Sequence, residues 1–329
     1  RSDEARERSN PRKKMTQKKP NGIKDRVRII KADARTLASM IEPKSVQCCV
    51  TSPPYYQLRD YRHDSQIGQE KTVQQFVDEL VTVFMQVHTV LKDDGVCWIN
   101  IGDTYAGKKQ GTDKVGDMHG VPWRLAFALK DAGWYLRQDI IWHKPSCAPE
   151  SAPDRCTRNH EYIFMMTKSR DYYFDQEAIK VKAVTAGSKF SSARIAMRQN
   201  DAMGFKFPPT EKQKVVRTVA DTKIKRSVWS VNPGGGVNNV EDTEHFASYP
   251  KKLIEPCILA TSKEGDWVLD PFMGSGTTAE VALFHGRKAV GCEINDDYIM
   301  IIGKRLKNMP QPVEHRSIFS GHKIRTQLR

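Results

Sequence analysis

The sequence predicts an α/β protein built on a doubly wound, mostly parallel sheet of seven strands. Three observations support this fold. From about residue 25 onward, short apolar strands alternate with helical stretches, which is typical of a sheet covered by helices on both faces. One strand ends in a glycine-rich turn at residues 270–278, and the next ends in an acidic residue about twenty positions later. This pairing is typical of sheets that bind a nucleoside.

The strands are predicted from apolar segments bounded by turn residues: Val27–Ile30, Val46–Thr51, Val96–Ile101, Leu136–Trp142, Ile163–Thr167, Trp267–Asp270 and Lys288–Cys292. Helices are predicted between them. In Val73–Leu91, apolar residues recur every three or four positions on one face. Pro122–Ala132 begins with proline in its first turn and ends before Gly133. Thr277–Phe284 follows the glycine-rich turn, and Asp296–Leu306 follows the last strand.

Composition narrows the class of protein. The chain has 329 residues, of which 39% are hydrophobic and 28% are charged, as in soluble globular proteins. No apolar run approaches the roughly 20 residues of a membrane span. Seven irregularly spaced cysteines without a CxxC pair predict neither a disulfide framework nor a metal site. The formal net charge of +14 favours a polyanionic partner such as DNA or RNA.

The turn Asp270-Pro271-Phe272-Met273-Gly274-Ser275-Gly276-Thr277-Thr278 predicts a cofactor site. Its two glycines permit a tight turn with backbone close to a ligand, and the following helix directs its first amides to the same place. Glu293, two residues before Asn295, can accept hydrogen bonds from both ribose hydroxyls. The segment lacks a GxGxxG pattern and the lysine of a P-loop. This favours an adenosine cofactor without pyrophosphate, namely S-adenosylmethionine.

The segment Ser52-Pro53-Pro54-Tyr55 follows a predicted strand and suits the exocyclic amine of a flat ring. Consecutive prolines hold the backbone extended, so the Ser52 oxygen and the Pro53 carbonyl can accept hydrogen bonds from the amine. Tyr55 offers an aromatic face for stacking. Methyl transfer to such an amine depends mainly on alignment and electrostatics. Alone, the segment is more typical of a proline turn; together with residues 270–278 it favours a catalytic loop.

In this order, the two motifs resemble those of DNA amino-methyltransferases of the beta arrangement, over roughly residues 26–307. The resemblance implies a methyltransferase fold, S-adenosylmethionine as cofactor and flipping of the target base. It places the methionine side of the cofactor at Tyr249 and Pro250 and its adenine side at Asp33. The expected cofactor residues are Asp33, Ala34, Tyr249, Pro250, Asp270, Pro271, Phe272, Gly274, Ser275, Gly276, Thr277, Thr278, Glu293 and Asn295.

The expected organisation follows from this resemblance. A flexible basic arm (1–24) precedes the catalytic half (25–180), a target-recognition insertion (181–239), the cofactor-binding half (240–309) and a C-terminal tail (310–329). Between residues 180 and 226 the chain has twelve Lys and Arg but only three acidic residues, which favours contact with DNA phosphates. The expected DNA-binding residues are Arg59, Lys189, Arg194, Arg198, Lys206, Arg217, Lys225 and Arg226.

The first position of the catalytic motif bears on the target. Serine is common there in relatives that methylate cytosine N4, and aspartate in those that methylate adenine N6. Ser52 therefore favours cytosine N4 in double-stranded DNA, as in restriction–modification systems, with adenine N6 as the alternative. A second alternative is a catalytically inactive DNA-binding protein. C5 methylation is disfavoured because Pro256-Cys257 lies in a segment that indicates a helix start or an apolar face. We expect a monomer or homodimer, in the cytoplasm at the nucleoid of a bacterial or phage host, or in the nucleus of a eukaryote.

Overall fold

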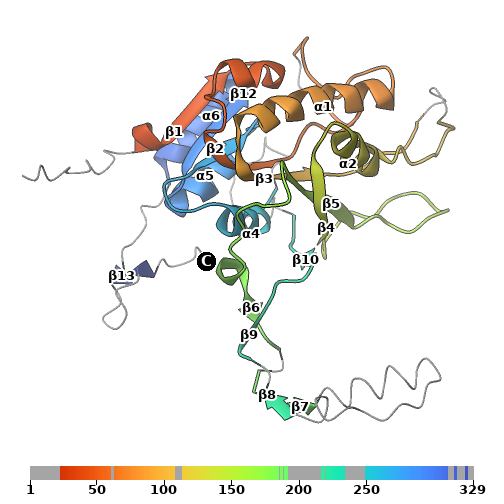
Figure 1. The fold of residues 1–329 in the computed structure, drawn as a ribbon. Helices are drawn as coiled ribbons and strands as arrows, with labels where there is room; N and C mark the ends of the chain where they lie inside the picture. Colours follow the sequence, from red (N-terminus) through yellow and green to blue (C-terminus); the bar gives the residue numbers. More distant parts are fainter. Residues whose placement is uncertain are drawn as a thin grey trace, which may run out of the picture.

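The computed structural model describes residues 23–60, 63–107, 113–184, 186, 187, 189–191, 216–218, 220–233, 249–309, 315, 316, 323 and 324. At its centre is an eight-stranded sheet with the order β1-β12-β11-β2-β3-β5-β4-β10. Its neighbouring strands are parallel except where β5 pairs antiparallel with β3 and β4. The predicted doubly wound, mostly parallel α/β fold is confirmed (Figure 1).

The strands of this sheet are β1 (Val27–Lys31), β2 (Val46–Thr51), β3 (Leu91–Ile101), β4 (Tyr135–His143), β5 (His160–Thr167), β10 (Val228–Ser230), β11 (Trp267–Asp270) and β12 (Lys288–Glu293). Each of the seven predicted strands is present. The sheet has one more strand than predicted, because β10 pairs with the edge of β4. In β10 only Trp229 is buried, so this short strand in a polar stretch has no apolar pattern to reveal it.

Helices cover both faces of the sheet. On one face lie α1 (Val73–Val90) and α2 (Val121–Asp131), together with the 3-10 helix η2 (Ala34–Ser39), and a second 3-10 helix, η1 (Ile23–Arg26), contacts β1. On the other face lie α4 (Lys251–Thr261), α5 (Thr277–Phe284) and α6 (Asp296–Lys307). Figure 1 shows α1 and α2 above the sheet and α4 below it. Cys257 is buried inside α4, away from any role as a nucleophile.

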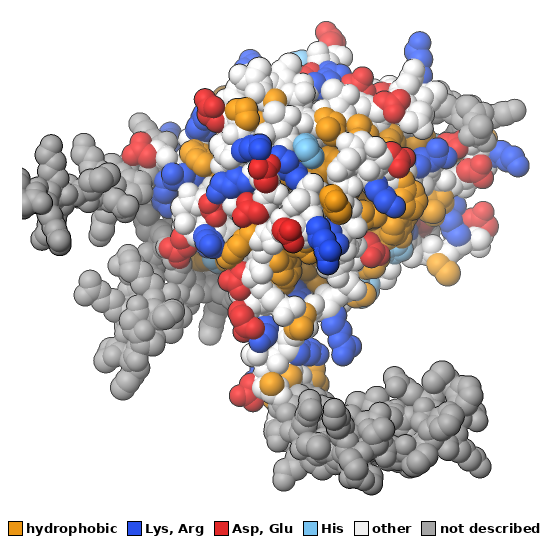
Figure 2. All heavy atoms as spheres, in the orientation of Figure 1, with side chains coloured by type: hydrophobic (Ala, Val, Ile, Leu, Met, Phe, Trp, Pro, Cys, Tyr) orange, Lys and Arg blue, Asp and Glu red, His pale blue; other side chains and the backbone are white. Residues whose placement is uncertain are grey.

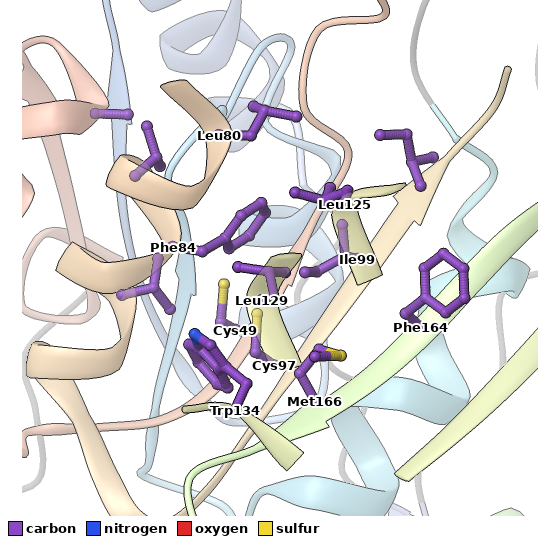
Figure 3. Packing of buried hydrophobic residues seen from close by; sticks show 14 of the residues in the cluster. Cys49, Leu80, Phe84, Cys97, Ile99, Leu125, Leu129, Trp134, Phe164 and Met166 are labelled. Atoms are coloured by element: carbon purple, nitrogen blue, oxygen red, sulfur yellow. The ribbon is translucent and has the colours of Figure 1, made fainter. Parts of the chain in front are cut away.

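The core is divided by the sheet into two clusters. Successive residues of a strand point to opposite faces, so in β2 Cys49 packs with α1 and α2 while Cys48 and Val50 pack with α4 and α5. Figure 3 shows the first cluster, where Leu80 and Phe84 of α1 meet Leu125 and Leu129 of α2 over the sheet. Because β2 is buried on both faces, the loop that follows it is held on a rigid strand.

The predicted insertion lies partly outside the described residues. Two small antiparallel pairs, β6 (Val181–Lys182) with β9 (Thr222–Lys223) and β7 (Lys189–Ser191) with β8 (Val216–Thr218), extend away from the sheet (Figure 1). The 3-10 helix η3 (Glu177–Ile179) precedes them. The expected DNA-binding residues Arg194, Arg198 and Lys206 lie outside the described residues, as does almost all of the basic arm. Of the tail, the structure describes only β13 (His315–Arg316) and β14 (Lys323–Ile324). The domain boundaries stay predictions.

The segments that carry the two sequence motifs lie at the same edge of the sheet. The parallel strands β1, β2, β3, β4, β11 and β12 all end at this edge. Because β5 is antiparallel, its first residues lie there too, with His160 opposite His143 and Tyr162 opposite Ile101. Ligands bind outside the carboxyl ends of strands in open α/β sheets, so this edge is where a site is expected.

Candidate active site

A cavity at this edge joins the two sequence motifs. Residues that follow β1, β2, β11 and β12 line it together with a loop at residues 65–67. Thirteen of the predicted catalytic and cofactor residues take part: Asp33, Ala34, Ser52, Pro54, Tyr249, Asp270, Pro271, Phe272, Gly274, Ser275, Thr277, Glu293 and Asn295. The predicted residues Pro53, Tyr55, Pro250, Gly276 and Thr278 are not among the residues that line it. Segments more than two hundred residues apart in the sequence therefore share one cavity.

The glycine-rich turn leads directly into α5. Gly274 and Gly276 have φ angles of 51° and 82°, a conformation that is rarely open to other residues. At Gly276 a Cβ would also lie 3.1 Å from the Ile302 side chain. The turn thus brings the first amides of α5, which have no partner within the helix, to the cavity wall.

Within the turn, Ser275 is the residue that points most clearly to a bound ligand. Its side chain is buried, and its hydroxyl has no hydrogen-bond partner. A buried hydroxyl without a partner costs free energy, and this one belongs to a residue that lines the cavity at the N-terminal end of α5. Such an end favours a negatively charged group. The turn is therefore suited to a carboxylate-bearing ligand.

Glu293 ends β12 and faces the same cavity. One carboxylate oxygen accepts a hydrogen bond from the Gly274 amide at 2.8 Å, and the other accepts one from the Asn295 amide at 2.9 Å. Burial raises the pKa of Glu293 above its usual value, although these amides act in the opposite direction. Each carboxylate oxygen has a second lone pair, so the side chain is oriented by the backbone and still able to accept from a diol.

Asp33 follows β1 and caps η2 by accepting from the Arg35 amide. The Arg35 guanidinium also binds both of its carboxylate oxygens, at 2.5–3.1 Å. Burial alone would raise the pKa of Asp33, but the hydrogen bonds and charge of Arg35 outweigh it and lower the pKa. Arg35 further contacts Glu79 of α1 and the Ser65 carbonyl. Arg35 thereby joins Asp33 to the 65–67 loop, which also lines the cavity.

Asp270 is the centre of a buried network that joins the two motifs. One oxygen accepts from the Thr51 hydroxyl at 2.7 Å and from the Phe272 amide at 3.0 Å. The other accepts from the Tyr249 hydroxyl at 3.0 Å and the Thr278 hydroxyl at 2.6 Å. Thr51 directly precedes the catalytic motif. Asp270 and Thr278 therefore lock the end of β2 to β11 and α5.

Burial raises the pKa of Asp270 from 3.8 to about 6, despite its four hydrogen bonds. The folded protein therefore holds this proton more tightly than the unfolded chain. The free energy of unfolding that the protonated Asp270 contributes is fully present below about pH 4 and is lost as the pH rises to about 6. A shift of about two units corresponds to about 3 kcal/mol.

We expect that the free energy of unfolding of the wild type, measured relative to that of Asp270→Asn, falls by about 2 kcal/mol between pH 4 and pH 7. Urea unfolding of both proteins across this range measures the difference. The replacement also disturbs the four hydrogen bonds, but that loss shifts the stability of the variant without adding a titrating group. Parallel pH profiles of the two proteins would contradict the prediction.

The catalytic motif leaves β2 as an extended loop. Ser52 and Pro54 line the cavity, and Pro53 is buried beneath it. The ring of Tyr55 is partly buried against the first core cluster, and its hydroxyl donates to Glu161 at 2.5 Å. Stacking of Tyr55 on a base stays a prediction. Among the motif residues, Ser52 and Pro54 have direct access to whatever the cavity binds.

Eight lining residues were not predicted from the sequence: Ala32, Ser65, Gln66, Ile67, Met273, Cys292, Ile294 and Tyr298. Four of these directly adjoin a predicted residue in the sequence, and that position could have revealed them: Ala32, Met273, Cys292 and Ile294. Tyr298 belongs to the first turn of α6, three residues after Asn295. Ser65, Gln66 and Ile67 belong to a loop without any motif, and only the fold brings them to the cavity.

The predicted DNA-binding residues are only partly described. Arg59 lies on the loop after the catalytic motif, and Arg226 is exposed. Lys225 is half-buried, with its ammonium 4.8 Å from the centre of the Trp229 ring, and burial lowers its pKa. The side chains of Lys189 and Arg217 lie outside the description. Figure 2 shows Lys and Arg interspersed with Asp and Glu over the visible face, so a DNA-binding role for these residues stays a prediction.

Among the described residues, no group of three or more His, Cys, Asp or Glu is arranged to hold a metal ion. Within the same part of the chain, no helix is both long and apolar enough to span a membrane. All seven cysteines are free thiols, and only Cys147 and Cys156 are exposed.

Comparison with known proteins agrees with this geometry. The family model of N6 and N4 DNA methylases matches residues 46–304. The type II methyltransferase M.Cfr9I of Citrobacter freundii is 40% identical, over 85% of this chain and 87% of its own length.

Two solved structures share the fold. The PvuII DNA methyltransferase, described as cytosine-N4-specific, is 18% identical with a TM-score of 0.62, and the match covers 88% of each chain. A Thermus thermophilus protein assigned as a DNA modification methylase, solved with S-adenosylmethionine, is 23% identical with a TM-score of 0.55. That match covers 86% of this chain and 95% of the other. At these identities the two structures support the fold alone.

Proposed function

The chain belongs to the family of N6 and N4 DNA methylases, and we propose that it transfers the methyl group of S-adenosylmethionine to the N4 amine of cytosine in double-stranded DNA. One observation supports this proposal above the others. Ser52 and Pro54 of the catalytic motif line the same cavity as Asp33, Gly274 and Glu293 of the cofactor site. An amine held by the first group would therefore face a methyl donor held by the second.

The residues of the cavity suit S-adenosylmethionine. Glu293, held by two backbone amides, would accept from the ribose hydroxyls. The unpartnered Ser275 hydroxyl and the first amides of α5 would receive the carboxylate of the methionine part. Asp33, Phe272 and Tyr298 line the remaining wall, where the adenine ring would lie. When bound, the cofactor supplies an electrophilic methyl group on a sulfonium.

The chain prepares the amine for attack through the catalytic loop. The lone pair of an exocyclic amine is delocalised into the ring, which makes the nitrogen a poor nucleophile. The Ser52 oxygen and the Pro53 carbonyl would accept its two N–H groups and favour a tetrahedral nitrogen. Pro53 and Pro54 keep this geometry stiff because their φ angles are fixed. Alignment and preorganised acceptors then supply most of the rate.

The base would reach the loop by flipping out of the duplex, which costs a few kcal/mol. Contacts of Lys and Arg with phosphates would offset this cost. The basic stretch at residues 180–226 lies between the catalytic and cofactor segments in the sequence, which supports its role in recognising the target. We propose that the protein is a type II methyltransferase, as M.Cfr9I is described.

Cytosine is favoured over adenine by Ser52, because serine at this position is common in relatives that methylate cytosine N4. To test the target, duplex DNA of random sequence would be incubated with the wild-type protein and S-adenosylmethionine, digested to nucleosides and separated by mass. We expect N4-methylcytosine. N6-methyladenine would shift the assignment to the alternative base. Binding of DNA without any methylated nucleoside would identify an inactive DNA-binding protein.

A further inference from the structure

A polar cluster lies beside the catalytic loop, outside the cofactor cavity. Its centre is Glu161, the second residue of β5, whose side chain is 13% exposed. Glu161 accepts hydrogen bonds from the Tyr55 hydroxyl at 2.5 Å and from the Asn100 amide nitrogen at 3.0 Å. It also accepts from the Lys144 ammonium, with which it forms an ion pair. Three donors from three segments thus converge on one carboxylate.

The Tyr55 ring is fixed where it meets this cluster. At Gly102, a Cβ would lie 2.8 Å from the Tyr55 ring and 3.3 Å from Glu161, so the ring packs directly on the glycine backbone. Burial, and then the charge of Glu161, raises the pKa of Tyr55 well above its usual value. The hydroxyl therefore keeps its proton at neutral pH.

The contacts of Tyr55 determine the direction of the hydrogen bonds. A hydroxyl has one proton to donate and two lone pairs to accept with. As a carboxylate, Glu161 only accepts, so the single proton of Tyr55 is donated to Glu161. This hydrogen bond fixes the end of the catalytic loop to β5. Because Pro53 and Pro54 stiffen the backbone between Ser52 and Tyr55, holding Tyr55 also holds Ser52.

We propose that Glu161 is a positioning residue for methyl transfer. By accepting the single proton of the Tyr55 hydroxyl, it fixes the end of the catalytic loop, so that the Ser52 oxygen and the Pro53 carbonyl meet the target amine in one geometry. Lys144 and Asn100 hold the carboxylate in place. The ammonium of Lys144 is itself fixed 4.4 Å from the centre of the Trp142 ring. This role rests on the proposed function and adds a residue that the cofactor cavity does not include.

The decisive test is energetic coupling between Ser52 and Glu161, which act on each other through Tyr55. In the wild type, Ser52→Ala is expected to lower kcat by about 100- to 1000-fold. Glu161→Ala should lower kcat by about 10- to 100-fold, and in that background Ser52→Ala should cost less than about tenfold. Tyr55→Phe should match Glu161→Ala, and the two together should be little worse than either alone. Glu161→Gln keeps one acceptor oxygen and should recover part of the rate.

Two further measurements distinguish a positioning role of Glu161 from a general structural defect in the variants. In Tyr55→Phe and Glu161→Gln, the KM for S-adenosylmethionine should stay within about twofold of wild type, because neither residue lines the cofactor cavity. Tyr162→Phe, which removes a hydroxyl from the next residue of β5, is the matched control and should keep wild-type kcat. If Glu161→Ala does not fold, the double-mutant cycle with Ser52→Ala is measured with Tyr55→Phe and Glu161→Gln in its place.

Wild-type kcat in Tyr55→Phe, or an equal cost of Ser52→Ala with and without Glu161, would overturn the role of Glu161 while leaving the proposed function intact. If the wild-type protein transfers no methyl group to DNA, the proposed function fails, and the role of Glu161 fails with it.

Discussion

Replacing Ser52 with alanine is expected to lower kcat for DNA methylation by about 100- to 1000-fold, the effect of removing one preorganised polar group that acts in a transition state. Ser52 lies at the cavity, directly after a strand that is buried on both faces. Its oxygen is therefore held in place before the substrate arrives. The acceptor matters most as positive charge develops on the attacking amine, so the loss should fall on kcat rather than on binding.

Single-turnover methylation of a duplex substrate measures this effect, and calorimetric titration with S-adenosylmethionine measures cofactor affinity. We expect the affinity to change by less than about threefold, because the proposed cofactor contacts come from Asp33, Ser275, Glu293 and their neighbours and not from Ser52. Ser39→Ala, at the end of η2 and away from the cavity, serves as a matched control. Activity of Ser52→Ala within tenfold of wild type would remove Ser52 from the chemistry.

The sequence was sufficient to predict the layout of the fold and most of the residues that line the cavity. Strands such as β2 and β11 are short apolar runs with both faces buried, so composition alone reveals them. The glycine turn and Glu293 also carry fixed chemical requirements, a positive φ and a paired acceptor, that few other residues meet. Predictions of this kind succeed because the physical constraint lies within a few consecutive residues.

Features that depend on contacts between distant segments were missed. Glu161 is one acidic residue at the start of an apolar strand, and its importance comes from β5 running antiparallel, which brings it next to Tyr55. The strand β10 is held by Trp229 and by the Trp142 indole, which donates to the Val231 carbonyl at 2.7 Å. Neither contact leaves a periodic pattern in the sequence. The Thr278 hydroxyl holds Asp270, a contact that the sequence did not indicate, and its predicted contact with the cofactor stays a prediction.

Replacing Glu293 with alanine is expected to weaken S-adenosylmethionine binding by about 100-fold, because two hydrogen bonds to a charged acceptor are lost. The loss is compounded because the Gly274 and Asn295 amides also lose their acceptor, which loosens the glycine turn. Burial raises the pKa of Glu293, so its proton binds at a higher pH than in an ordinary glutamate. Protonation removes the acceptor charge, and wild-type affinity should therefore fall on acidification from a higher pH than an exposed glutamate would cause.

Calorimetric titration of S-adenosylmethionine at several pH values tests both expectations. DNA affinity, measured without cofactor, should be unchanged, because Glu293 lies inside the cofactor cavity. Asp296→Ala is the matched control: its carboxylate lies three residues away, is largely exposed and pairs with Lys31 on the surface, where ion pairs contribute little. Wild-type cofactor affinity in Glu293→Ala would show that the ribose is held elsewhere. An equal loss in Asp296→Ala would show that the effect comes from charge near α6 rather than from the acceptor at the end of β12.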